Sequence, residues 1–114
     1  MFDREGLEKR IERMSDLPDD WDGCGTSPLS VSVAKIGKRL LQYIPAEAVQ
    51  SVKVFVGINT PGSLFVEIIQ ESRVIEMTVV PGGNIFWDEW ICGTECGSGQ
   101  FVLSRRKMAE ILDG

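Results

Sequence analysis

Three cysteines, Cys24, Cys92 and Cys96, have the widest chemical range of any side chains in this sequence. A thiolate can attack a substrate or bind zinc. Catalysis by a thiol needs an adjacent base and structural zinc needs four ligands, yet the chain contains no histidine to serve either role. We therefore expect three free thiols in a reducing compartment, with no catalytic residue, metal or cofactor. A small cysteine- or metal-dependent enzyme is the alternative.

Aspartates crowd one short segment, in which Asp19, Asp20 and Asp22 flank Trp21 and Gly23 follows. Clustered carboxylates followed by glycine can bind calcium, but the calcium loop also needs a glutamate near its twelfth position, and none stands there. We expect the aspartates to accept hydrogen bonds from nearby backbone amides and to start turns. Asp19 and Asp20 are also candidates for contact with a protein partner.

Two tryptophans, Trp87 and Trp90, lie in one predicted strand and differ in parity, so they should point to opposite faces of a sheet. One fits beneath helices, and the other should lie beside Asp88 or Glu89 on the open face or at an edge. Partly exposed aromatic side chains rimmed by acids are typical of protein interfaces. With Glu95, these residues form the main candidate interface. The alternative is that the last helix or a second copy of the chain covers the exposed ring.

The charge balance argues against several partners. The net charge is −5, and Arg105-Arg106-Lys107 is the only basic cluster, so direct binding to nucleic acid is not expected. The apolar runs are far shorter than the roughly 20 residues of a membrane span. The charged first residues lack the apolar stretch of a secretory signal. We expect a cytoplasmic protein.

Two helices are predicted in the first half of the chain. Apolar residues recur at helical spacing over 3–14 and, more strongly, over 29–44. Pro18 breaks the first pattern, while Ser27 is predicted as the N-cap of the second helix with Pro28 in its first turn. A short third helix is predicted to follow Ser104.

The pattern changes to alternation of apolar and polar residues after residue 51, which predicts strands. Glu67, Glu71 and Glu76 occupy positions typical of a solvated face. We predict a loop over 93–99, because it holds three glycines. The chain should form one α+β domain over 1–114, an antiparallel meander with two N-terminal helices and a short C-terminal helix. Its four strands are 52–58, 64–69, 74–80 and 85–91, with a fifth short edge strand at 101–103.

The stretch Leu-Pro-Asp-Asp-Trp-Asp-Gly-Cys-Gly at 17–25 precedes the second predicted helix. It resembles a Leu-Pro-x-x-Trp-Asp-Gly-x-Gly motif in a family of small bacterial and phage proteins with no assigned activity. Cys24 stands where an aromatic residue is typical. The resemblance covers 17–44 and implies a structural motif of Trp21, Asp22, Gly23 and Gly25, with Trp21 packed under the helix.

These observations favour a non-enzymatic, acidic protein-binding module. Its sharpest version is a phage or mobile-element inhibitor of a host defence complex, similar to an anti-CRISPR protein, because a small acidic protein can occupy a basic nucleic-acid-binding surface. A third interpretation is a homo-oligomeric scaffold, such as a homodimer, whose open sheet face is self-complementary.

Overall fold

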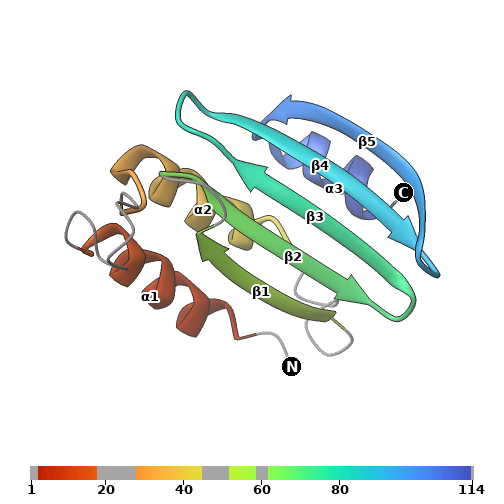
Figure 1. Ribbon diagram of the computed structural model, residues 1–114, viewed down its shortest axis with the longest axis horizontal. Helices are drawn as coiled ribbons and strands as arrows, with labels where there is room; N and C mark the ends of the chain where they lie inside the picture. Colours follow the sequence, from red (N-terminus) through yellow and green to blue (C-terminus); the bar gives the residue numbers. More distant parts are fainter. Residues whose placement is uncertain (1–2, 18–27, 45–51, 59–61, 114) are drawn as a thin grey trace.

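The computed structural model describes residues 3–17, 28–44, 52–58 and 62–113 (Figure 1). It confirms the predicted α+β fold, with two helices followed by five strands and a final helix. The elements are α1 (Arg4–Ser15), α2 (Val31–Gln42), β1 (Val52–Ile58), β2 (Leu64–Gln70), β3 (Arg73–Val79), β4 (Asn84–Ile91), β5 (Thr94–Val102) and α3 (Arg105–Asp113).

The sheet is a meander in which every strand pairs antiparallel with the next, in the order β1-β2-β3-β4-β5. Figure 1 shows the three helices on the same face of the sheet. Every second strand residue turns its side chain to that face, and most of these side chains in β1, β2 and β3 are buried there. The buried apolar residues of the strands are Val52, Val54, Val56, Leu64, Val66, Ile68, Ile75, Met77, Val79, Ile85 and Phe101.

The helices supply the other half of this core. Ile11 of α1, Leu40 and Leu41 of α2, and Met108 of α3 are all fully buried. Burying a side chain of this size stabilises the fold by about 1.5–3 kcal/mol, so the apolar stripes that predicted the helices also hold them to the sheet. Among the described residues, no helix has the length and apolar character needed to cross a bilayer.

Polar side chains fix the helix ends. Asp3 caps α1 by accepting from the amide of Gly6, and Ser104 caps α3 as predicted, by accepting from the amide of Lys107. The prediction of Ser27 and Pro28 at the start of the second helix was wrong. Ser30 is its N-cap.

The hydroxyl of Ser30 accepts from the amide of Val33 at 3.2 Å, so α2 begins at Val31. The preceding Leu29 is pinned outside the helix, because its amide donates to the carbonyl oxygen of Met14 at 3.1 Å and its side chain is buried. The N-cap is therefore Ser30, three residues after the Ser27 that the sequence pattern favoured.

The predicted loop over 93–99 is also wrong, because β5 runs from Thr94 to Val102. The turn is confined to Cys92 and Gly93, which both have positive φ (51° and 81°). Such a two-residue turn matches the twist of a hairpin. Gly97 and Gly99 are strand residues, and the indole of Trp87 lies against both.

Candidate protein interface

The sheet face opposite the helices carries three rows of side chains, each running across the strands. None of the described elements covers this face, which we call the open face. Strand pairing gives the members of each row, from β1 to β5. The first row is Lys53, Ile69, Val74, Trp90 and Glu95, and the second, in the middle, is Phe55, Glu67, Glu76, Asp88 and Ser98. The third row is Gly57, Phe65, Thr78, Phe86 and Gln100.

The middle row is an acidic stripe made by Glu67, Glu76 and Asp88. Glu76 of β3 pairs directly with Glu67 of β2 on one side and with Asp88 of β4 on the other. Cβ atoms of directly opposed residues lie roughly 4.5–5.5 Å apart, and like charges in such pairs destabilise a sheet. Among the described residues, no ion pair involves any of these three carboxylates. The stripe therefore keeps an uncompensated negative charge.

Apolar side chains border the acidic stripe on both sides and at one end. Phe55 on β1 is 53% exposed and Phe86 on β4 is 46% exposed. Phe65, Val74 and Trp90 are half-buried on the same face. Exposed rings around a charged strip are a surface that a partner can desolvate, and aromatic anchors of this kind dominate binding energies.

Strand pairing divides the predicted interface residues between the two faces. Trp90, Asp88 and Glu95 lie on the open face, whereas Trp87 and Glu89 turn toward the helices. The tryptophans thus point to opposite faces, as their parity indicates. The pairing of β4 with β5 shifts by one residue after Glu89, but the extra residue is on β5, so the parity of β4 is kept.

The helix-facing Glu89 already has a partner. Its carboxylate accepts from the guanidinium of Arg73, which also donates to the carbonyl oxygens of Ile111 and Leu112 at the end of α3. The side chains of Arg73 and Glu89 are 17% and 13% exposed. Glu89 therefore helps to fix α3 on the sheet and has little surface to offer a partner.

Two of the cysteines are exposed free thiols, Cys92 in the β4–β5 turn and Cys96 in β5. Desolvation raises the pKa of the Cys96 thiol, and the charge of Glu89 and its hydrogen bond raise it further. A raised pKa keeps the thiol protonated, which makes it a poor nucleophile and a poor metal ligand. Within the described residues, no group of three or more cysteine and carboxylate side chains is arranged to hold a metal ion. Cys24 lies outside the described residues.

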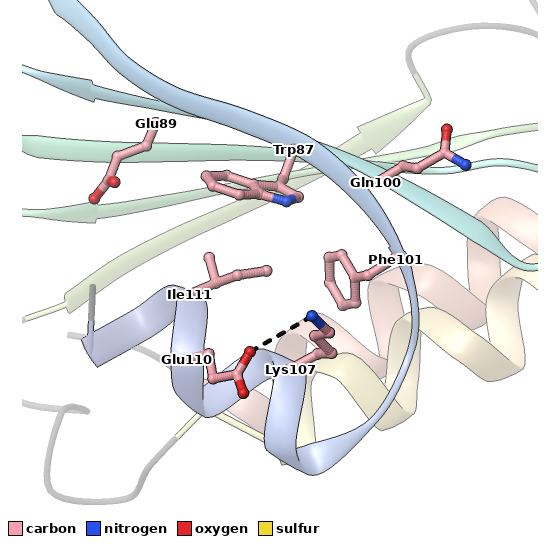
Figure 2. Close-up of a pocket in the computed structure, with 7 residues that line it drawn as sticks. All are labelled: Trp87, Glu89, Gln100, Phe101, Lys107, Glu110 and Ile111. Atoms are coloured by element: carbon pink, nitrogen blue, oxygen red, sulfur yellow. Dashed lines mark ion pairs between the residues drawn. The ribbon is translucent and has the colours of Figure 1, made fainter.

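Two hollows flank β5, one on each face of the sheet. The first, of about 220 Å³, lies between the sheet and α3. Figure 2 shows Trp87 and Phe101 reaching down from the strands and Ile111 reaching up from α3, with the Lys107–Glu110 ion pair beside them. The second, of about 440 Å³, lies over Phe86, Asp88, Ser98 and Gln100. Both hollows reach the strand at the sheet edge.

The acidic turn residues Asp19 and Asp20 and the motif residues Trp21, Asp22, Gly23 and Gly25 lie outside the described residues. Sequence reasoning missed Phe55 and Phe86 as interface residues. Their signal was present, since each stands at the solvent-facing parity of an alternating strand. The acidic stripe could not be predicted in this way. It depends on how β2, β3 and β4 pair, and the residue pattern of one strand does not determine that pairing.

Comparison of the chain with protein-family models, with curated proteins and with solved structures gave no match.

Proposed function

We propose that this chain is a non-enzymatic binding module that docks a basic protein surface against the open face of its sheet. The observation that carries the proposal is the acidic stripe of Glu67, Glu76 and Asp88, bordered by the exposed rings of Phe55 and Phe86. A partner with lysine or arginine side chains around an apolar patch complements this pattern. Such charge complementarity gives fast and selective association.

The charges also argue against a second copy as the occupant. Within the described strands, the open face carries the carboxylates of Glu67, Glu76, Asp88 and Glu95 against one ammonium group, that of Lys53. Two such faces packed together would oppose like charges at their centres, at a cost that the apolar borders have to offset. A basic partner meets no such cost.

The sharpest form of the proposal is an inhibitor of a host complex that binds nucleic acid, carried by a phage or mobile element. Surfaces that bind nucleic-acid phosphates are rich in lysine and arginine, and an acidic stripe can occupy such a surface in place of the nucleic acid. This form predicts that nucleic acid and the module compete for one site on the partner.

The test compares capture by the tagged protein and two variants from a bacterial lysate. Phe55→Ser/Phe86→Ser removes both exposed rings, and Glu76→Lys reverses the centre of the stripe. Val31→Ser is the matched control, because Val31 is 64% exposed but stands at the start of α2, among the helices. We expect one protein that the parent and the control capture and that both face variants lose.

The captured protein is then purified and its affinity measured at increasing salt and against competing DNA and RNA. Weakening by salt and displacement by nucleic acid support the inhibitor form. A partner that binds both face variants as tightly as the parent overturns the proposal. A homodimer in light scattering that Glu76→Lys disrupts also overturns it, in favour of the scaffold.

A further inference from the structure

The outer edge of β5 pairs with no other described strand, and its stretch from Gly97 to Val102 lacks the features that usually protect an edge strand. β5 pairs only with β4 among the described strands. Proteins commonly protect an edge strand with lysine, proline or a bulge. The one irregularity of β5 lies at Cys96, and the stretch from Gly97 to Val102 contains no charged residue and no proline. Every second residue there directs its N–H and C=O groups away from β4.

The other edge of the sheet differs. α1 packs against β1, and Lys53 stands on that strand. Figure 1 shows α1 lying along the β1 side of the sheet and no helix beyond β5. Among the described residues the two edges are therefore not equivalent: α1 lies against β1, whereas β5 has a hollow on each face of the sheet beside it.

The two hollows lie on opposite faces of the sheet beside β5, where the side chains of an added strand would point. Side chains of a strand alternate between the faces of a sheet. A strand laid along β5 would send alternate side chains toward the hollow of about 220 Å³ under the sheet and the hollow of about 440 Å³ on the open face. Gly97 and Gly99 face the helices without side chains, and the indole of Trp87 lies over them and forms one wall of the lower hollow.

The linings of the hollows specify the chemistry of these side chains. The lower hollow presents the apolar surfaces of Trp87, Phe101 and Ile111. Its remaining lining is polar and consists of Glu89, Gln100 and the Lys107–Glu110 ion pair. The upper hollow presents the ring of Phe86 beside the carboxylate of Asp88. Among the described residues, no lysine or arginine forms an ion pair with this carboxylate. An arginine or lysine can stack on the ring and pair with the carboxylate there.

We infer that the chain binds its partner by strand addition at β5, taking an extended segment in which basic and apolar residues alternate. The inference rests on the proposed function and gives it a mode of recognition. Main-chain hydrogen bonds to Gly97–Val102 supply affinity, and the two hollows supply specificity.

A second copy of the chain is a poorer occupant of this edge. Its β5 would bring Gly97 and Gly99, which have no side chain, to the lower hollow, and its Phe101 is already buried in its own core. Its upward-facing Ser98 and Gln100 carry no positive charge to meet Asp88.

The probe is an acetylated heptapeptide in which arginine alternates with valine, titrated into the isotope-labelled protein and followed by NMR. We expect amide shifts and slowed hydrogen exchange concentrated in Gly97–Val102. Asp88→Asn should weaken binding about threefold to fivefold, the range of a partly exposed ion pair. Glu67→Gln removes the same charge from the same stripe two strands away and should weaken binding less than Asp88→Asn. Glu71→Gln removes a carboxylate from the β2–β3 turn, outside the stripe, and is the control that should leave the affinity unchanged. The same peptide with N-methylated amides should bind at least roughly tenfold more weakly, because it cannot complete the ladder.

Three results would overturn strand addition. Amide shifts that spread over Phe55 and Glu67, with equal losses of affinity for Asp88→Asn and Glu67→Gln, would place the peptide across the open face. The proposed function would then still stand. No binding at millimolar peptide would exclude this edge as the site. A dimer of the free protein with protected β5 amides would make a second copy the occupant. The proposed function fails separately, when the Phe55→Ser/Phe86→Ser variant retains the captured partner.

Discussion

Arg73 and Glu89 form an ion pair on the helix-facing side of the sheet, and through it β3 and β4 hold the last turn of α3. The carbonyl groups at the end of a helix have no partner within the helix. Arg73 donates to two of them and to Glu89 with one planar guanidinium group. This relationship joins two neighbouring strands, β3 and β4, to the C-terminal helix α3.

Arg73→Ala should destabilise the protein strongly, because it leaves the carboxylate of Glu89 largely buried without its cation. Breaking a buried pair in this way costs about 3–5 kcal/mol. Urea unfolding followed by circular dichroism measures the loss. Arg106→Ala is the control, because its ion pair with Glu110 is exposed and such pairs contribute about 0.5 kcal/mol or less. Equal losses for the two variants would contradict the structural role of Arg73.

The glycines of β5 make room for Trp87, so adding a methyl group there should destabilise the protein. A Cβ at Gly99 would lie 3.0 Å from Nε1 of Trp87, and one at Gly97 would lie 3.3 Å from its Cη2. Overpacking of this kind costs about 1–3 kcal/mol, and we expect Gly99→Ala to cost more than Gly97→Ala.

Gly57→Ala is the matched control for these variants. Gly57 is also a strand glycine, but a Cβ built on it meets no atom within 4 Å. Its replacement should stabilise the protein by about 0.4–1 kcal/mol by reducing the freedom of the unfolded chain. Thermal unfolding of all three variants tests the order. If Gly99→Ala is as stable as the parent, the indole is not confined by this strand.

The sequence predicted the helices, four strands and the meander because each depends on a local pattern. The stripe at Val33, Leu40 and Ile44 and the alternation over 52–58 report burial directly. The loop prediction over 93–99 failed because glycine is ambiguous. The glycines at 97 and 99 accommodate the indole of Trp87. This contact is with another strand, so the residue pattern of 93–99 alone does not indicate it.

The candidate interface was predictable only in part for the same reason. The parity of Trp87 and Trp90 separated the two rings correctly, and Asp88, Trp90 and Glu95 do share one face. Glu89, however, belongs with Arg73, which stands sixteen positions earlier in the chain. The acidic stripe required the register of three strands, and register is set by turns whose geometry follows from the fold.

The thiol of Cys96 should titrate at a higher pH in the folded protein than in the unfolded chain, because its folded-state pKa is raised above the ordinary value of 9.0. Both states keep the proton below the unfolded pKa, so the stabilising contribution of the neutral thiol is fully present there. As pH rises, the unfolded thiol ionises first, and this contribution is lost as pH passes through the folded pKa.

Alkylation rates against pH measure this shift in the variant Cys24→Ser/Cys92→Ser, which leaves only Cys96. The midpoint should lie above 9.0 for the folded protein and return toward that value in urea. A folded midpoint below the unfolded one would reverse the sign. It would also revive the thiol-dependent enzyme as an interpretation, because a depressed pKa marks an activated cysteine.

Glu76→Gln should raise stability and lower partner affinity at the same time. Glu76 lies between Glu67 and Asp88, so neutralising it relieves two like-charge neighbours, each repulsion costing about 0.2–1 kcal/mol. Glu67, Glu76 and Asp88 are half-buried and still reach solvent, so the gain should shrink as salt screens the repulsion between them. Glu5→Gln removes the same charge from α1, where Glu5 pairs with Lys9, and should slightly lower stability. Urea unfolding of both variants at low and high salt measures the changes in stability and their dependence on salt.

A sheet that keeps a destabilising row of carboxylates needs a reason outside its own fold, and binding to a basic partner supplies one. If Glu76→Gln instead destabilises the protein, the stripe contributes to folding and the argument for a docking role loses its basis.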